Sequence, residues 1–111
     1  MGNAPSVTWP GKSGQKYEYS VYPLGTSFKE IPGNYIYAKK TQAGLWSPCY
    51  IGQTDNLSER LGNHEKEPCA KRQGATHIHV HGNGNGERTR KAEEADLIVN
   101  YKPPCNDQLV S

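Results

Sequence analysis

Apolar and polar residues alternate in three short stretches of the chain, and each stretch predicts a β-strand. Residues 34–39 are rich in Tyr and Ile, residues 49–52 read Cys-Tyr-Ile-Gly, and residues 75–81 alternate regularly. In the third stretch Ile78 and Val80 face one way, whereas the histidines between them face the other way. A polar loop over 40–47 separates the first two strands, and this arrangement predicts an antiparallel hairpin.

Helical signals follow the second and third strands. Asn56 and the two residues before it are good N-caps, and Glu59 lies three residues after Asn56, as in a capping box. The helix that starts there turns Leu57 and Leu61 inward and weakens at Gly62. Residues 64–74 are polar and contain a proline, which predicts a short helical turn followed by a loop. Residues 87–101 form the longest predicted helix, and two prolines end it.

The order strand, strand, helix, strand, helix predicts an α+β domain of the broad α/β class. We expect a small, mostly antiparallel three-stranded sheet flanked by helices within residues 29–111. Residues 1–28 are expected to form a flexible N-terminal extension, in which the weak alternation over 17–22 could add an edge strand because Tyr17, Tyr19 and Val21 share one side.

Composition limits the classes of protein that fit. The 111 residues allow one domain, and only 33% of them are apolar, so the core must be small. The formal net charge of +2 is compatible with a polyanionic partner but does not indicate a basic nucleic-acid-binding arm. The chain contains no stretch of membrane-spanning length and no secretory signal. Its three cysteines are odd in number and widely spaced, which predicts reduced thiols in a cytoplasmic protein.

Three pieces of sequence resemble the GIY-YIG nuclease superfamily, whose members include the excision-repair incision nuclease and homing endonucleases. The first is Pro32-Gly33-Asn34-Tyr35. The second is Tyr50-Ile51-Gly52-Gln53-Thr54, followed by Leu57, Arg60, Leu61 and His64. The third is Glu94, Leu97-Ile98 and Pro104-Cys105-Asn106. The resemblance spans residues 32–106 and implies a metal-dependent endonuclease. Asn34 departs from the pattern, because an apolar β-branched residue is usual there, and the loop between the two tyrosines is a few residues longer than usual.

Helical geometry places the polar residues of the second and third pieces. Arg60 and His64 are four residues apart, so both project from one face of the same helix toward a possible phosphate. Three- and four-residue steps from Glu94 reach Leu97, Ile98 and Tyr101, so the carboxylate of Glu94 is expected at the edge of the core. A carboxylate in that position is costly unless it is paired or bound to a metal. The same steps from Glu93 reach a more polar set, which favours Glu94.

The resemblance assigns roles to six residues. Tyr35 and Tyr50 would line the site and position or deprotonate the attacking water, together with His64, and the sequence leaves open which tyrosine is the base. Arg60 would stabilise charge on the phosphate, Glu94 would bind one Mg²⁺ or Mn²⁺ ion, and Asn106 would fix local structure. The expected partner is nucleic acid, most simply DNA, with no membrane involved. A protein partner that selects the target is possible, and the oligomeric state is open.

Two other functions compete with this one. The same fold could serve as a catalytically idle module that binds nucleic acid or protein. Alternatively His77, His79 and His81, which alternate on one strand face, could reach a common zinc or nickel ion. We expect instead that the three histidines form the polar outer face of an edge strand. Further basic residues could contact the phosphate backbone of a nucleic acid: Lys39, Lys40, Lys71, Arg72, Arg88, Arg90 and Lys91.

Overall fold

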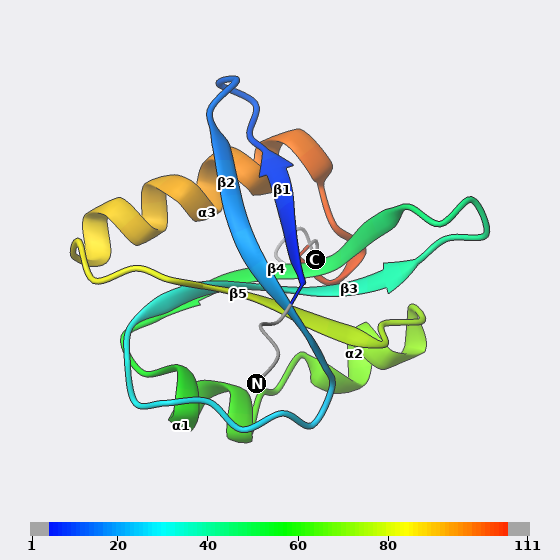
Figure 1. Cartoon of the computed structure of the whole chain (residues 1–111), viewed down its shortest axis with the longest axis horizontal. Helices are drawn as coiled ribbons and strands as arrows, with labels where there is room; N and C mark the ends of the chain where they lie inside the picture. The colour runs from blue at the N-terminus through cyan, green and yellow to red at the C-terminus, as the bar shows by residue number, and fades with distance from the viewer. Residues whose placement is uncertain (1–4, 107–111) are drawn as a thin grey trace.

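The computed structural model describes residues 5–106, which form one curved sheet and three helices. In chain order the elements are β1 (Ser6–Pro10), β2 (Lys16–Pro23), β3 (Gly33–Lys40), β4 (Trp46–Thr54), α1 (Leu57–Gly62), α2 (Glu67–Arg72), β5 (His77–Gly82) and α3 (Glu87–Tyr101) (Figure 1). Neighbouring strands are all antiparallel, in the spatial order β1-β2-β5-β3-β4. The predicted antiparallel α+β architecture is confirmed, but the prediction of three strands is wrong, because the sheet has five.

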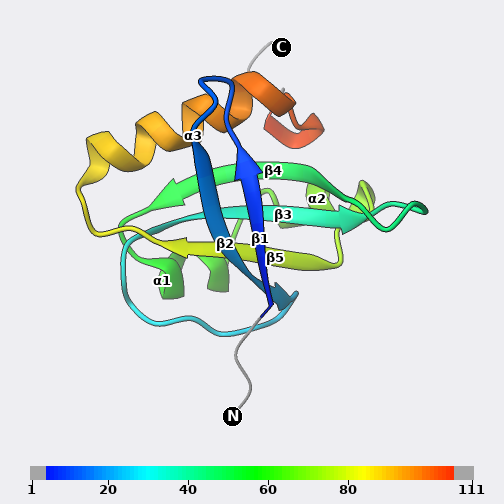
Figure 2. The ribbon, with the colours of Figure 1, turned by 45° about the horizontal axis from the view of Figure 1, so that its top comes forward.

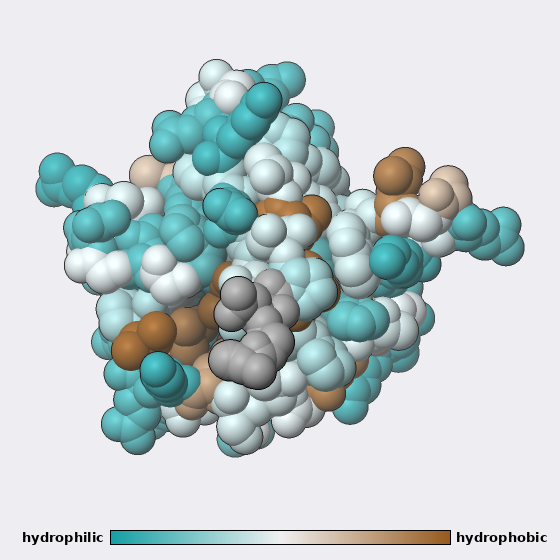
Figure 3. Space-filling model, in the orientation of Figure 1, coloured by the Kyte–Doolittle hydropathy of each residue, from teal (hydrophilic) through white to brown (hydrophobic). Residues whose placement is uncertain are grey.

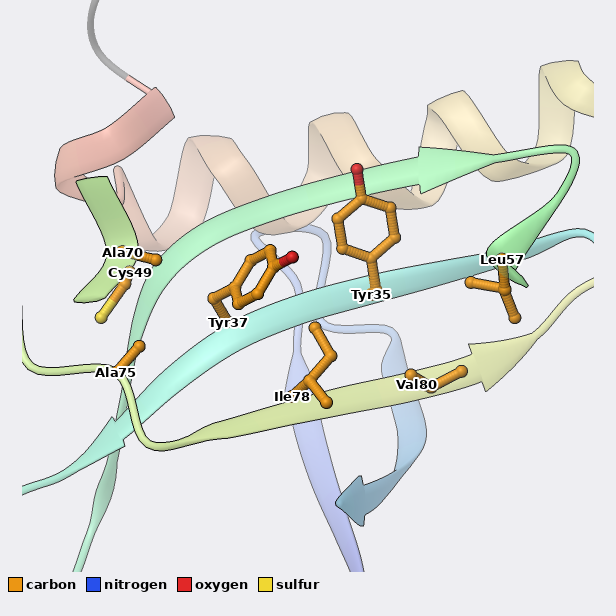
Figure 4. Close-up of a cluster of buried hydrophobic side chains, with 8 residues drawn as sticks. All are labelled: Tyr35, Tyr37, Cys49, Leu57, Ala70, Ala75, Ile78 and Val80. Carbon is orange, nitrogen blue, oxygen red and sulfur yellow. The ribbon is translucent and has the colours of Figure 1, made fainter. Parts of the chain in front are cut away.

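Helices cover both faces of the sheet, with α1 and α2 on one face and α3 on the other (Figure 2). Successive residues of a strand point to opposite faces, so the sheet contributes to two separate cores. The core beneath α1 and α2 contains Tyr35, Tyr37, Cys49, Leu57, Ala70, Ala75, Ile78 and Val80 (Figure 4). The core beneath α3 contains Trp9, Tyr19, Ile36, Ala38, Ile51 and Leu97.

The N-terminal hairpin, formed by β1 and β2, extends the sheet beside β5. A strand near residues 17–22 is confirmed as β2, but it lies between β1 and β5 and not at the edge. The expectation of a flexible lead-in is wrong for residues 6–10, which form β1 and bury Trp9 to 4% exposure. This strand was missed because its local alternation is weak and its stability comes from burial of the indole against α3. Residues 1–4 of the predicted extension lie outside the described residues.

The turn between β1 and β2 is attached to α3 through Asp96. The carboxylate of Asp96 accepts hydrogen bonds from the Ser13 backbone N–H (2.8 Å), the Ser13 hydroxyl (2.7 Å) and the Tyr17 hydroxyl (2.8 Å). The bonds from Ser13 lower the pKa of Asp96. Further along α3, the Asn100 side-chain amide donates to the carbonyl of Pro10 at 2.9 Å. The hairpin is therefore held along the C-terminal half of the helix.

The alternation over residues 75–81 is confirmed in β5, but the position of this strand differs from the prediction. Ile78 and Val80 pack beneath α1 and α2 as expected. The expectation that the histidine row faces water at a sheet edge is wrong, since β5 lies between β2 and β3. His79 is 0% exposed and its Nδ1 accepts a hydrogen bond from the Trp9 indole at 3.0 Å. Burial lowers the pKa of His79 to about 4.

The helix boundaries follow the predicted signals. The side chain of Asn56 caps α1 by accepting a hydrogen bond from the Glu59 backbone N–H at 3.1 Å. The helical turn expected within residues 64–74 is α2. The long helix is confirmed as α3, which ends at Lys102, a residue in the left-handed conformation with φ of 48°.

Two of the three cysteines are joined. Cys69 in α2 and Cys105 after α3 form a disulfide across 36 residues, whereas Cys49 is free and buried. The expectation of three reduced thiols is therefore wrong. An odd number of widely spaced cysteines carries no pairing signal, because only the fold shows which two of them come together.

One face of the molecule, in the orientation of Figure 1, is largely hydrophilic. Polar residues cover most of the face seen in Figure 3, and apolar colour appears at the tip of the β3–β4 hairpin, where Leu45 is 67% exposed. None of the helices within residues 5–106 is long and apolar enough to cross a membrane.

Substitutions on the buried side and on the exposed side of α3 should change the stability of the protein by different amounts. Leu97 is 0% exposed, so Leu97→Ala should lower the free energy of unfolding by about 2–5 kcal/mol through lost burial and a cavity. Val99 is 53% exposed, so Val99→Ala should change it by less than about 0.5 kcal/mol. Urea denaturation of both variants measures the difference, and equal effects would contradict the packing of α3.

Candidate active site

Two tyrosines form the sheet-borne part of the candidate site. Tyr35 in β3 and Tyr50 in β4 lie on the face covered by α1 and α2, with ring centroids 6.3 Å apart and nearly parallel rings. Tyr35 pairs with Gly52 across the two strands, and a Cβ at Gly52 would lie 2.6 Å from the Tyr35 hydroxyl oxygen. Glycine at this position therefore allows the Tyr35 phenol to lie across the neighbouring strand.

His64 follows α1 and places its imidazole among three tyrosines. The ring centroid of His64 lies 5.4 Å from that of Tyr35, 5.5 Å from Tyr37 and 5.1 Å from Tyr50. Its Nε2 is 2.6 Å from the Tyr35 hydroxyl oxygen. Tyr37 was not among the predicted site residues, although a two-residue step from Tyr35 along the strand places it on the same face (Figure 4).

The backbone fixes the tautomer of His64. The N–H of Lys66 donates to Nδ1 of His64 at 2.9 Å, so Nδ1 carries no proton. The neutral imidazole then has its proton on Nε2 and donates it to the Tyr35 hydroxyl oxygen. Burial, followed by the positive charge of Arg60, lowers the pKa of His64 to about 4. His64 is therefore a neutral hydrogen-bond donor at pH 7.

Arg60 acts on both tyrosines from α1. The prediction that Arg60 and His64 share a face of one helix is wrong, because α1 ends at Gly62 and His64 follows it. Burial raises the pKa of Tyr35 and of Tyr50, whereas the guanidinium of Arg60 lowers both. Burial lowers the pKa of Arg60 itself, but interactions with Tyr35 and Glu65 outweigh it and raise the pKa. The Arg60 Nη1 donates to the exposed carboxylate of Glu65 at 3.2 Å. The four residues Tyr35, Tyr50, Arg60 and His64 thus meet at one place.

The charge of Glu94 acts on one member of this group, Tyr50. Its negative charge raises the pKa of Tyr50, while Arg60 has the opposite effect, so the Tyr50 phenol lies within the influence of both charges. Burial raises the pKa of Glu94, and no residue within 5–106 donates a hydrogen bond to its half-buried carboxylate. A carboxylate in this state is suited to a hard divalent cation.

Glu93, the neighbour of Glu94, is the more deeply buried of the two glutamates, at 5% exposure. The periodicity argument ranked their burial wrongly, because polar partners surround Glu93 on the sheet. Its carboxylate accepts hydrogen bonds from Tyr19 (2.6 Å), His81 (2.9 Å) and Asn83 (3.3 Å). The bond to Glu93 raises the pKa of His81. Glu93 is therefore occupied within the fold.

Asn34, the departure in the first motif, belongs to the same buried network. Its amide donates to the carbonyl of Arg90 at 2.9 Å and its oxygen accepts from Asn83 at 3.1 Å. An apolar residue here would leave these partners without their bonds. The network borders a cavity of about 630 Å³ between β2, β5 and α3, on the sheet face opposite the two tyrosines. That cavity is separate from the candidate site.

Asn106 contacts the site through β4. Its side-chain oxygen accepts from the N–H of Ile51 at 2.8 Å, and its side-chain nitrogen donates to the carbonyl of Ile51 at 2.9 Å. Both bonds are to the residue next to Tyr50.

Some of the predicted contact residues are engaged elsewhere. Arg90 is 6% exposed and donates to Gln53 (3.0 Å) and to the carbonyl of Asn83 (3.2 Å), so its guanidinium is engaged within the fold. Lys71 pairs with Glu67, and Lys91 with Glu87. The remaining predicted cations form no ion pair within the described part of the chain: Lys39, Lys40, Arg72 and Arg88.

The three histidines of β5 have separate partners. Nδ1 of His77 lies 2.8 Å from the Thr76 hydroxyl oxygen. His79 accepts a hydrogen bond from the Trp9 indole, and His81 is hydrogen-bonded to the Glu93 carboxylate. Within residues 5–106 no group of three or more histidine, cysteine or acidic side chains could hold a metal ion. The histidine row therefore offers no shared site for zinc or nickel in this arrangement.

Comparison with known proteins identifies relatives of this arrangement. No family model and no curated protein matches the chain. Among solved structures, the GIY-YIG N-terminal endonuclease domain of UvrC from Thermotoga maritima, bound to its catalytic magnesium, is 32% identical, with a TM-score of 0.56 over 70% of this chain and 85% of that domain.

Two point mutants of the same domain, each bound to its catalytic divalent cation, also match. One replaces a tyrosine by phenylalanine and is 31% identical, with a TM-score of 0.55 over 72% of this chain and 87% of the domain. The other replaces an asparagine by alanine and is 31% identical, with a TM-score of 0.55 over 69% and 83%. The shared fold and this level of identity across most of the domain confirm the resemblance seen in the sequence motifs. The chain belongs to the GIY-YIG endonuclease family.

Proposed function

We propose that this chain is a metal-dependent endonuclease that hydrolyses phosphodiester bonds in DNA. The observation that carries the proposal is the convergence of two phenols, an arginine and a neutral histidine, with Glu94 acting on the same Tyr50 phenol. A site for phosphodiester hydrolysis needs charge stabilisation and a positioned proton acceptor, and this set supplies both.

Glu94 is the residue proposed to hold the metal. A half-buried carboxylate without hydrogen-bond donors fits one Mg²⁺ or Mn²⁺ ion, since such ions bind proteins through one or two carboxylates and take further oxygens from water and phosphate. The bound ion would supply Lewis-acid stabilisation of the phosphate and of the leaving oxygen.

Tyr35 is the residue proposed to accept the proton of the attacking water. His64 donates its Nε2 proton to the Tyr35 oxygen, and Arg60 acts on the same phenol. Burial raises the pKa of Tyr35, and the Arg60 guanidinium opposes this rise, as would a hydrogen bond donated to the phenol oxygen. His64 itself is poorly suited to be the base, because its only unprotonated nitrogen is occupied by the N–H of Lys66. We assign His64 to positioning Tyr35, and Arg60 to stabilising charge on the phosphate.

Binding of DNA is assigned to the basic residues without ion pairs, namely Lys39, Lys40, Arg72 and Arg88. Contacts of this kind reach phosphates and carry no sequence information, so binding should weaken with added salt and tolerate many sequences.

Glu94→Gln tests the proposed metal ligand. Loss of the negative charge should reduce cleavage of plasmid DNA in Mg²⁺ by at least about a hundredfold, because transition-state charge would no longer be stabilised. The fold should persist, since no hydrogen bond to Glu94 is lost. Glu87→Gln is the matched control: Glu87 lies on the same helix and pairs only with exposed Lys91, so activity should be retained.

The outcome also separates a nuclease from a binding module. Wild-type protein that binds DNA but leaves it intact with Mg²⁺ and with Mn²⁺ would refute the nuclease assignment and favour a module that only binds.

Stability should depend on pH through His64. Its folded-state pKa of about 4 lies below the usual value of 6.5, so the unfolded state binds more protons between these values. The contribution of neutral His64 to the free energy of unfolding should be complete above pH 6.5 and should be lost as the pH decreases from 6.5 toward 4. His79 adds a dependence of the same sign.

Urea denaturation of wild type and His64→Gln at pH 7.5 and pH 5.5 measures this effect. The variant should lose less stability on acidification than wild type, because glutamine does not titrate. An identical loss in both proteins would show that His64 is not held neutral by the fold.

A further inference from the structure

We propose that the Cys69–Cys105 disulfide is a positioning element of the site. It holds the Asn106 side chain against β4, and it holds α2 in its place after His64. Reduction of the disulfide therefore lowers the rate of cleavage. The statement about cleavage rests on the proposed function. The statement about positioning rests on contacts of the chain and can be tested without catalysis.

The first contact is the attachment of Asn106 to an open strand edge. β4 is the last strand of the sheet, so within residues 5–106 one side of it has no neighbouring strand. The Asn106 side chain bonds both the N–H and the carbonyl of Ile51, at 2.8 and 2.9 Å. One amide side chain thus takes the place of a pairing strand at the residue next to Tyr50, and limits how far this part of β4 can move.

The segment that carries Asn106 follows α3 and closes the described part of the chain. The helix α3 stops at Lys102, and the backbone N–H of Asn106 makes a local bond to Pro103 at 3.1 Å. Cys105 precedes Asn106 directly, is 0% exposed and is bonded to Cys69. The covalent bond therefore lies one residue from the amide that contacts Ile51.

The other end of the disulfide lies close to His64. Cys69 belongs to α2, a helix of six residues that follows His64 by three residues. A helix this short is not stable without tertiary support. The backbone N–H of Lys66, at the start of α2, fixes the tautomer of His64. One disulfide therefore joins the segment that carries Asn106 to the short helix that follows His64.

The bond can be opened by a dithiol reductant. Cys69 is half-buried and Cys105 is buried, so a thiolate of the reductant can attack the Cys69 sulfur and release the Cys105 thiolate, which takes up a proton. The second thiol of the reductant then displaces Cys69 from the mixed disulfide. Two protein thiols form, and the reductant becomes a disulfide.

Two measurements on the full chain test the proposal: amide hydrogen exchange and the kinetics of DNA cleavage. Oxidised wild type, wild type reduced with dithiothreitol, and Cys69→Ser are compared by amide exchange at Ile51. We expect protection of this amide to fall at least tenfold in the last two samples. Amides of β3, which is paired on both sides, should keep their protection and show that the sheet remains folded.

In the same samples kcat should fall by between about tenfold and a hundredfold, because small displacements of positioned groups slow catalysis. KM should change less than kcat, since of the basic residues assigned to DNA binding only Arg72 belongs to α2, whereas Lys39, Lys40 and Arg88 lie outside it. Reoxidation should restore wild type but not Cys69→Ser. The control Cys49→Ala removes the remaining thiol and should keep the full response to reductant.

Unchanged protection of Ile51 after verified reduction would overturn the proposal, as would loss of protection without a change in kcat in an active enzyme. If oxidised wild type cleaves no DNA, the proposed function fails, whereas the exchange at Ile51 still decides whether the disulfide positions Asn106.

Discussion

The pairing of β3 with β4 is the constraint on which the rest of the molecule depends. Its register sets Tyr35 opposite Gly52 and brings the Tyr50 ring alongside. A shift by one residue would turn every side chain of one strand to the other face, exchanging the tyrosines with the residues that contact α3. The hydrogen bond between Tyr35 and His64 can form only in the observed register, and the orientation of the α1 end follows from it.

Covering both faces of a small sheet brings polar groups into the interior. Beneath α3 the fold buries Asn34, Asn83, Arg90 and Glu93, each with hydrogen-bonded partners. Such a network costs desolvation and is tolerated only when its members are satisfied together. This accounts for the polar residue in the first motif: Asn34 lies on the side of β3 away from the tyrosines and serves α3, so its unusual identity leaves the candidate site unchanged.

Local signals predicted the elements that depend on local physics. The cap at Asn56, the alternation in β5 and the length of α3 were readable because caps and periodicity act within a few residues. The motifs contain Tyr35, Tyr50, Arg60 and His64, which the structure brings together. β1 and the interior place of β5 could not be predicted, since β1 is held by the burial of Trp9 against α3 and β5 is interior because β2 pairs with it. The same holds for the disulfide and for the burial of Glu93 over Glu94, where distant partners decide the outcome.

The close approach of Tyr35 to the backbone of Gly52 leaves no room for a side chain on the opposite strand. Any larger residue there would push the phenol out of its place before altering the overall fold. A related chain with a bulky residue at the corresponding position can therefore be recognised from its sequence alone. In such a chain the two phenols cannot lie side by side as they do here.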